Sequence, residues 1–150
     1  MNFDAIVDKV ISHGLSLGIF DRVNFHEPKN APGNGLTMAA WIQQVSPAPG
    51  ASGLGATTGL IILNVRLYSS MTQEPQDAID PGLISAMDVL FTAYSGDFDL
   101  GGTVRNIDLL GQFGTPLSSQ AGYLEVAGKM YRIMTIALPI VVNDLWAQVP

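Results

Sequence analysis

Two short motifs in this chain contain residue types used in nucleotide binding and hydrolysis. Residues 53–59 read GLGATTG, which is one residue too long for the G-x-G-x-x-G motif that cradles a pyrophosphate. That motif follows a strand and opens a helix, whereas here a strand-like run, LIILNVRLY, comes after the glycines. The G-x-x-x-x-G-K-[ST] motif does not occur in the chain. The pattern therefore argues against a phosphate-binding loop.

The second motif, GLSLG at residues 14–18, matches the G-x-S-x-G sequence around the serine nucleophile of many hydrolases. In those enzymes the serine lies on a strand-to-helix turn, but here a helical pattern precedes it and a strand follows. The histidines are His13 and His26, so the order Ser, acid, His would have to fit within ten residues. We interpret the two glycines as helix-ending residues, and a small serine hydrolase using Ser16 stays a distant alternative.

The carboxylates do not match a metal or acid–base motif either. Neither histidine has a partner four residues away, and the D-x-D-x-D-G calcium loop is missing from the sequence. Asp97 and Asp99 are interpreted as part of a solvated turn. Glu74, Asp77 and Asp80 surround two prolines, where turn and capping roles suit them better than catalysis. We therefore expect no catalytic residues, no metal and no cofactor, and a protein that is not an enzyme.

The composition indicates one domain with an unusually uncharged surface. Charged residues make up 13 % of the 150 residues, against roughly 25 % in a typical soluble domain. Such a surface is expected where other subunits cover it. The chain has no cysteine, which excludes disulfides and thiolate sites. The sequence shows neither a membrane-spanning run nor a signal-peptide pattern, so we expect intracellular synthesis and no membrane partner.

The negative charge is concentrated in one stretch. The formal net charge is −6, and residues 72–99 contain no Lys or Arg. The carboxylates in this stretch are Glu74, Asp77, Asp80, Asp88, Asp97 and Asp99. Specific binding to nucleic acid normally needs a basic face, and the sequence does not predict one.

Hydrophobic spacing predicts two helices. The first carries apolar residues from Phe3 to Leu15 and ends near a glycine. The second has Asp80 as its N-cap and is closed by Gly96 in the left-handed conformation. Its apolar stripe is predicted to consist of Ile84, Met87, Phe91 and Tyr94, widened by Leu83 and Leu90.

Alternating patterns predict six strands, at residues 21–27, 36–45, 60–69, 103–110, 120–126 and 130–142. Pro139 is expected to bend the last strand or release it from pairing. The order α-β-β-β-α-β-β-β predicts a single α+β domain over residues 1–150. Its sheet should be mostly antiparallel, with both helices packed on one face.

An uncharged insert, SPAPGASGLGATTG at residues 46–59, separates two of the strongest strands. It lies inside one domain, so we do not interpret it as a linker between domains. We predict a protruding hairpin loop whose residues 47–58 form an arm that packs on a neighbour, with Leu54 as the anchoring side chain. The candidate interface residues are Pro47, Pro49, Gly50, Gly53, Leu54 and Gly55.

Four long segments resemble tail proteins of long-tailed phages that infect actinobacteria. They read HEPKNAPGNGL at 26–36, RLYSSMTQEPQDAIDP at 66–81, AYSGDFDLGGTVRNIDLLG at 93–111, and QAGYLEVAGKMYRIMTIALPIVVNDLW at 120–146. The resemblance covers nearly the whole chain. It is strongest to the tail terminator group, which takes part in tail completion and head–tail joining.

The resemblance implies an α+β subunit of a homo-oligomeric ring, commonly a hexamer. Such a ring would cap the tail tube, stop its elongation and dock to the head–tail connector protein. It would lie at the head–tail junction of the virion after synthesis in the host cytoplasm. The implied partners are the chain itself, the tail tube protein, the connector protein and DNA that passes non-specifically through a central channel. The resemblance transfers no catalytic or motif residue.

The acidic stretch has a possible role in such a ring. Carboxylates lining the channel would repel DNA phosphate over about 8 Å at physiological salt, so that DNA passes without adhering. We therefore take the six carboxylates of residues 72–99 as the candidate channel lining. A head-side neck or connector subunit is the alternative within assembly proteins.

Overall fold

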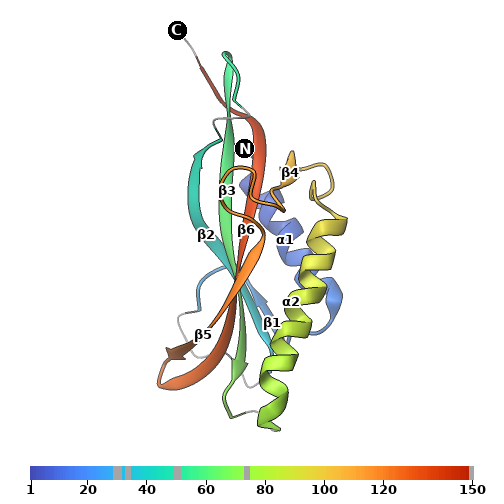
Figure 1. The fold of residues 1–150 in the computed structure, drawn as a ribbon, viewed down its shortest axis with the longest axis vertical. Coiled ribbons are helices and arrows are strands. Elements are labelled where there is room, and N and C mark those ends of the chain that lie inside the picture. Colours follow the sequence, from blue (N-terminus) through green and yellow to red (C-terminus); the bar gives the residue numbers. More distant parts are fainter. Residues whose placement is uncertain (29–31, 33–34, 49–51, 73–74, 149–150) are drawn as a thin grey trace.

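The computed structural model describes the chain except residues 29–31, 33–34, 49–51, 73–74 and 149–150. Two helices cover one face of a long, curled sheet of six strands (Figure 1). The sheet is mixed, since one of its strand pairs is parallel and the others are antiparallel. The predicted single α+β domain and the predicted order of elements are confirmed.

Helix α1 spans Phe3–Leu17. The Asn2 side chain accepts a hydrogen bond from the Ala5 N–H, and Gly18 closes the helix with φ of 67°. This end matches the preference for glycine where the backbone turns left-handed. Gly18 therefore ends the helix just after Ser16, as predicted, whereas Gly14 is buried within α1 and does not end it.

Helix α2 spans Ile79–Gly96 and follows a short 3-10 turn, η2, at Gln76–Ala78. The predicted N-cap is wrong: the cap is Ala78, and Asp80 lies inside the first helical turn with its carboxylate directed to Arg132. The predicted closure is also wrong, because Asp97 is the C-cap and Gly96 does not have positive φ. The preceding 3-10 turn moves the start of the helix, and the Asp97 N–H bonds to the Ala93 carbonyl.

The buried stripe of α2 differs from the predicted one. Ile84 is 52 % exposed. The side chains buried on α2 are Ile79, Leu83, Ala86, Leu90 and Tyr94. Apolar residues occupy more than half of the helix circumference, so hydrophobic spacing alone did not select the face that docks on the sheet.

The strands are β1 at Arg22–Asn24, β2 at Thr37–Pro47, β3 at Ala56–Ser70, β4 at Asn106–Ile107, β5 at Ser118–Val126 and β6 at Lys129–Ala147. Their order across the sheet is β1-β2-β3-β6-β4, and β5 also pairs with β6. The central pair, β3 and β6, is antiparallel from Ala56↔Ala147 to Ser70↔Tyr131.

Several predicted strand ends are wrong. β3 begins four residues before Leu60, and β6 continues past Val142, because each of these segments pairs with the other. The predicted strand at 103–110 is reduced to the two residues of β4, and the one at 21–27 to the three of β1. These boundaries depend on which segments pair across the sheet, and hydrophobic alternation within one segment does not indicate its partner.

Pro139 does not release the last strand from β3, but it lies outside the registers of both β5 and β4, so the predicted release is found on one edge of β6 only. It stays opposite Ile62 in β3, and its carbonyl accepts a hydrogen bond from the Asp108 N–H on the other edge. The nitrogen and carbonyl of one strand residue face the same edge. The proline nitrogen therefore faces the gap between β5, which pairs as far as Ala137, and β4, which pairs from Ile140.

The main core lies between the helices and the sheet. Its buried side chains include Ile6, Val10, Met38, Ile61, Leu63, Leu83, Leu90, Ile136 and Leu138. The opposite face carries two smaller clusters. One contains Ala39, Tyr68, Tyr131 and Ile133, and the other Ala48, Leu60, Ile62 and Val141.

Candidate functional site

A narrow ribbon projects at the end of the molecule where the chain terminates (Figure 1). From here on, the arm means residues 52–57 and 145–148 of this ribbon, in place of the arm predicted at residues 47–58. β2 ends at Pro47 opposite Gly59, so beyond that point β3 pairs with β6 alone, through Thr57↔Trp146 and Ala56↔Ala147. Gln148 strengthens the ribbon: its N–H donates to the Gly55 carbonyl at 2.9 Å and its Nε2 to the Thr57 hydroxyl at 2.8 Å. β2 and β3 pair as the predicted antiparallel hairpin, from Thr37↔Tyr68 to Pro47↔Gly59, and the arm extends beyond that pairing as a ribbon of β3 and β6.

The base of the arm is packed and hydrogen-bonded. Ala48 is fully buried beside Leu60 and Ile62, and its N–H donates to the Thr58 carbonyl at 2.8 Å. The Ser52 hydroxyl donates to the Ala48 carbonyl at 2.9 Å and accepts from the Thr58 N–H at 3.2 Å. The first part of the insert therefore belongs to the domain body, and the projection begins only after it.

The tip of the arm is a tight turn that exposes Leu54. The Gly53 N–H donates to the Ala56 carbonyl at 3.0 Å, so Leu54 and Gly55 occupy the turn. Leu54 is 99 % exposed, and Trp146 on the same ribbon is 42 % exposed. Fully burying a leucine side chain is worth about 1.5–3 kcal/mol. A partner that covers this tip would gain that free energy, whereas the isolated chain does not.

The predicted interface residues are only partly brought together. Gly53 and Gly55 flank Leu54, and Pro47 is exposed at the end of β2, below the arm. Pro49 and Gly50 lie outside the described residues. Sequence reasoning missed the contribution of Trp146 to the arm, because the strand that carries it was expected to end at residue 142.

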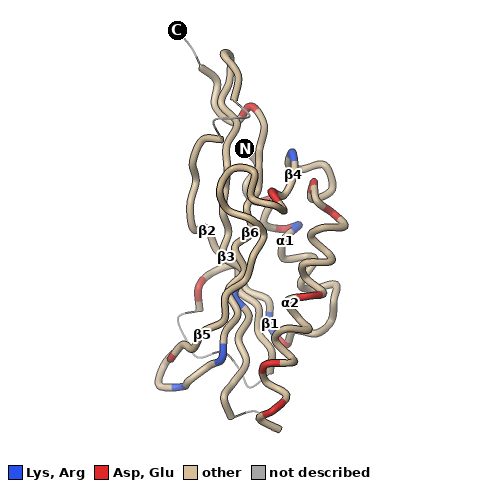
Figure 2. The backbone as a smooth tube through the Cα atoms, in the orientation of Figure 1, with Lys and Arg blue, Asp and Glu red and all other residues tan. Residues whose placement is uncertain are grey.

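The predicted acidic residues follow one side of the molecule. Figure 2 shows carboxylates along α2 and the turn after it. Asp77 and Asp88 are exposed, Asp99 is half-buried, and Glu74 lies outside the described residues. Asp80 bonds to the guanidinium of Arg132, and Asp97 bonds to the ring of His13. The stretch is therefore spread along α2, and two of its members are engaged in contacts within the subunit.

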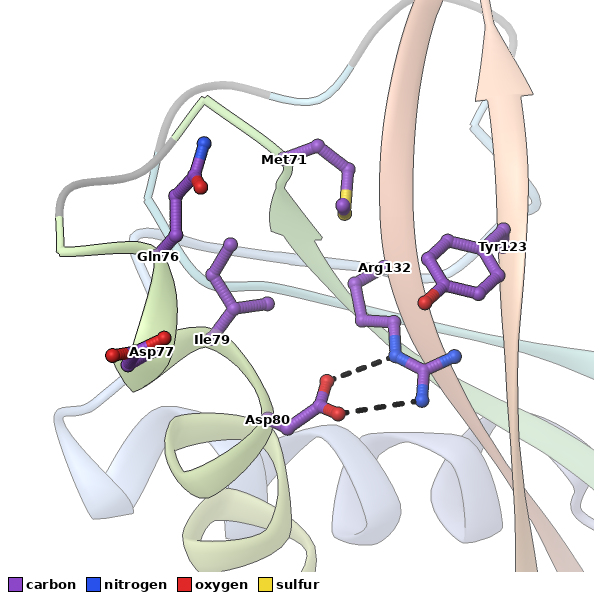
Figure 3. Close-up of a pocket in the computed structure, with 7 residues that line it drawn as sticks. All are labelled: Met71, Gln76, Asp77, Ile79, Asp80, Tyr123 and Arg132. Atoms are coloured by element: carbon purple, nitrogen blue, oxygen red, sulfur yellow. Dashed lines mark hydrogen bonds and ion pairs between the residues drawn. The ribbon is translucent and has the colours of Figure 1, made fainter.

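Asp80 forms one wall of a hollow of about 370 Å³ beside β6 (Figure 3). Arg132 Nε donates to Asp80 Oδ1 at 2.9 Å, and its guanidinium lies 4.4 Å from the centre of the Tyr123 ring. This hydrogen bond is the main reason why the pKa of Asp80 lies below its usual value. Asp80 thus stays ionised at neutral pH and ties α2 to the sheet.

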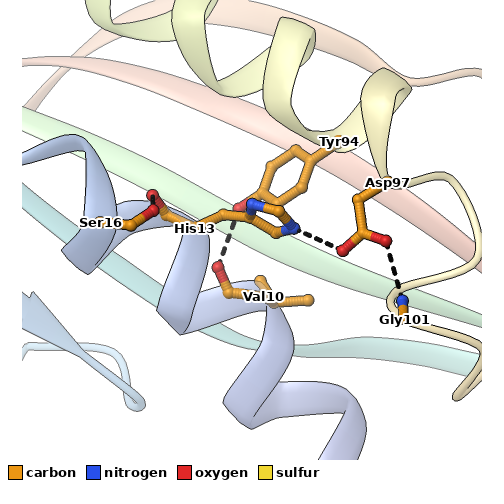
Figure 4. A network of polar contacts seen from close by, with 6 residues as sticks. All are labelled: Val10, His13, Ser16, Tyr94, Asp97 and Gly101. Carbon is orange, nitrogen blue, oxygen red and sulfur yellow. Dashed lines mark hydrogen bonds and ion pairs between the residues drawn. The ribbon is translucent and has the colours of Figure 1, made fainter.

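Asp97 belongs to a polar network that joins the two helices (Figure 4). Its Oδ2 lies 2.8 Å from His13 Nε2, and its Oδ1 accepts from the Gly101 N–H at 2.8 Å. The His13 ring meets the Tyr94 ring edge-on at 5.5 Å, and burial raises the pKa of the Tyr94 hydroxyl. The Tyr94 hydroxyl donates to the Val10 carbonyl. Asp97 lies in the predicted turn, but its carboxylate is only partly exposed and bonds to His13 and Gly101.

Replacing Asp97 with Asn is expected to destabilise the protein in a pH-dependent way. Burial opposes ionisation, but hydrogen bonds from Gly101 and His13 outweigh it, so the pKa of Asp97 lies below 3.8. A carboxylate with a lowered pKa in the folded state stabilises the protein above its unfolded pKa. That stabilisation is lost as the pH falls below 3.8, the pKa of an unperturbed Asp, and then through the lower pKa that Asp97 has in the folded protein.

Urea unfolding of wild type and Asp97→Asn between pH 7 and pH 2.5 measures this effect. The difference in unfolding free energy should be largest above about pH 4 and should shrink below it. Asp88→Asn, on the exposed side of α2, controls for the loss of one negative charge. A difference between wild type and Asp97→Asn that stays constant over the whole range would contradict this assignment.

Ser16 is expected to tolerate replacement by Ala. Its hydroxyl donates to the His13 carbonyl at 3.1 Å on the exposed side of α1, while the His13 ring bonds to Asp97. Exposed substitutions of this kind usually change stability by about 0.5 kcal/mol or less. Thermal unfolding and hydrolysis of a p-nitrophenyl ester should not distinguish Ser16→Ala from wild type. Loss of a wild-type esterase activity in this variant would favour the hydrolase alternative.

Within the described residues, no three His, Asp or Glu side chains lie close enough together to hold a metal ion. No helix of that part of the chain is long and apolar enough to cross a membrane. Among the described residues, the large apolar side chain with the greatest exposure is Leu54 of the arm. No protein-family model matches this chain, and a search of curated proteins likewise finds no match.

Proposed function

We propose that this protein is a phage tail terminator: a structural subunit that forms a ring, caps the tail tube and stops its elongation. The ring offers a docking surface to the head connector and leaves a central channel for DNA. The proposal rests on the resemblance of four long segments to that group of tail proteins. The α+β domain agrees with the fold that the resemblance implies.

The structural observation that supports the proposal is the arm. It places an almost fully exposed leucine on a two-stranded ribbon that extends beyond the domain body. A two-stranded ribbon has little stability of its own in water. Charged residues make up only 13 % of the chain, as expected for a subunit that other proteins cover.

The test is electron microscopy of the purified protein, alone and mixed with tail tubes assembled without it. Rings alone and a ring at one end of each tube are expected. Tubes that grow further after addition of the protein would contradict capping. A ring that binds the portal or adaptor and not the tube end would identify the head-side connector instead.

The channel role of the acidic stretch stays a prediction. Asp77 and Asp88 are exposed and available to face DNA, whereas Asp80 and Asp97 are engaged within the subunit. A ring structure that places Asp77 and Asp88 on its outer rim would overturn this part of the proposal.

A further inference from the structure

Strand β5 has one long edge without a partner strand in the described part of the chain. It pairs with β6 from Ser118↔Ala137 to Val126↔Lys129 without a register shift. No other described strand pairs with it. A strand with one open edge presents a row of backbone donors and acceptors to whatever lies beside it.

The register identifies the groups that point outward. On β6, the Pro139 and Val141 carbonyls accept hydrogen bonds from the Asp108 and Arg105 N–H groups, on the edge that β4 and β5 share. Backbone groups alternate between the two edges along a strand. The odd-numbered residues of β6 therefore bond to the even-numbered residues of β5. The outward residues of β5 are Ser119, Ala121, Tyr123 and Glu125.

This edge lacks the features that protect exposed strands from pairing. Its nine residues contain no proline and no basic residue, and Glu125 is their single charge. By contrast, the partly open edge of β2 is interrupted by a register shift between Ile42 and Gln44 and ends on Pro47. Bulges, prolines and lysines are the devices that prevent edge pairing. β5 is thus the edge that is suited to strand addition.

We propose that the β5 edge of one subunit accepts the arm of a second copy of this chain as an added strand. This inference rests on the proposed ring and names the contact that builds it. The ladder of the arm pairs only Ala56 and Thr57 with Trp146 and Ala147, so an added strand would stabilise this ribbon by widening it. The β5 edge supplies that third-strand ladder.

The two surfaces are also compatible in charge. The arm contains no charged residue in 52–57 or 145–148, so its approach to β5 brings no like charges together. Tyr123 on β5 is 62 % exposed and offers an aromatic surface to the apolar side chains of the arm. The arm and the β5 edge are different parts of the chain, so the contact between two copies is heterologous. It propagates from copy to copy and forms a ring when the rotation closes.

The first test replaces Ala121, which is exposed and whose N–H points away from β6. Ala121→Pro removes that outward donor and blocks addition while leaving the hydrogen bonds to β6, since edge strands tolerate proline. Ala121→Ser keeps the N–H and is the matched control. In sedimentation velocity, Ala121→Pro should associate at least tenfold more weakly than wild type, and Ala121→Ser should match wild type.

The second test uses the absence of native cysteines. Leu54→Cys is mixed with Tyr123→Cys, and separately with Ile84→Cys, whose position on α2 is similarly exposed. A disulfide should form rapidly with position 123 and not with position 84. This measurement decides the question if Ala121→Pro does not fold.

Normal association of a folded Ala121→Pro, or equal cross-linking to positions 123 and 84, overturns the inference. The proposed function fails separately. If Ala121→Pro assembles into rings that cap tubes, the proposed function holds and the proposed contact is refuted. If the protein cross-links to position 123 but does not bind tail tubes, the proposed contact holds and the proposed function is refuted.

Discussion

Replacing Leu54 with Asp is expected to leave the subunit folded and to abolish tail capping. Leu54 is 99 % exposed, so the isolated subunit loses no buried surface when it is replaced. In the assembled state the variant loses about 1.5–3 kcal/mol of leucine burial. It must also bury a carboxylate without a partner, which costs several kcal/mol more. Association should therefore weaken by roughly 100-fold or more, since each 1.4 kcal/mol is a factor of ten.

Leu110→Asp is the matched control for this variant. Leu110 is 94 % exposed in the loop after β4, is not part of the arm, and receives the same substitution. Tail lengths measured by electron microscopy should be uncontrolled with Leu54→Asp and normal with Leu110→Asp. Equal behaviour of the two variants would show that the arm has no special role. Thermal unfolding of each subunit excludes misfolding as the cause.

Replacing Gly111 with Ala is expected to destabilise the subunit by about 2–5 kcal/mol, the sum of two costs. Gly111 has φ of 74°, and a left-handed conformation costs a residue with a side chain about 1–2 kcal/mol. A Cβ at this position would lie 2.8 Å from the backbone nitrogen of Pro116, and relieving such crowding costs about 1–3 kcal/mol. A backbone atom of a proline cannot move aside as the end of a flexible side chain can.

Gly102→Ala isolates the conformational part of this cost. Gly102 has φ of 81°, but a Cβ there would meet nothing within 4 Å. We expect it to lose only about 1–2 kcal/mol. Calorimetry should show roughly a 5–15 °C lower Tm for Gly111→Ala and a smaller decrease for Gly102→Ala. Equal decreases would mean that the loop moves away from Pro116 at no cost.

The loop that carries Gly111 also supports the arm. The buried Asp108 carboxylate accepts the N–H groups of Gln112 and Phe113 at 2.8 and 2.9 Å. Phe113 then packs against the cluster that contains Ala48, at the base of the arm. Strain at Gly111 is therefore expected to loosen the arm as well as the domain. Amide hydrogen exchange at Thr58 reports on that effect.

Local sequence patterns were sufficient for the number, type and order of the elements. The apolar runs of β3 and β6 reflect burial in the sheet, and the helical spacing of Ile6, Val7 and Val10 reflects burial on one face of α1. Each segment carries this information by itself. The ends of elements were less predictable. Ala56 and Thr57 have no hydrophobic alternation, and they form a strand because Trp146 and Ala147 pair with them from 90 residues away.

At the candidate site, too, some features follow from the sequence and others depend on tertiary contacts. The sequence by itself determined a single α+β domain, an uncharged insert and an exposed Leu54, because composition and short-range periodicity carry that information. Only the tertiary structure decided that the arm is built from β3 and β6, that Asp80 and Asp97 are held by Arg132 and His13, and that β5 is an open edge. Each of these depends on contacts between residues far apart in the chain, and no local pattern specifies which distant partner a backbone group or a carboxylate will meet.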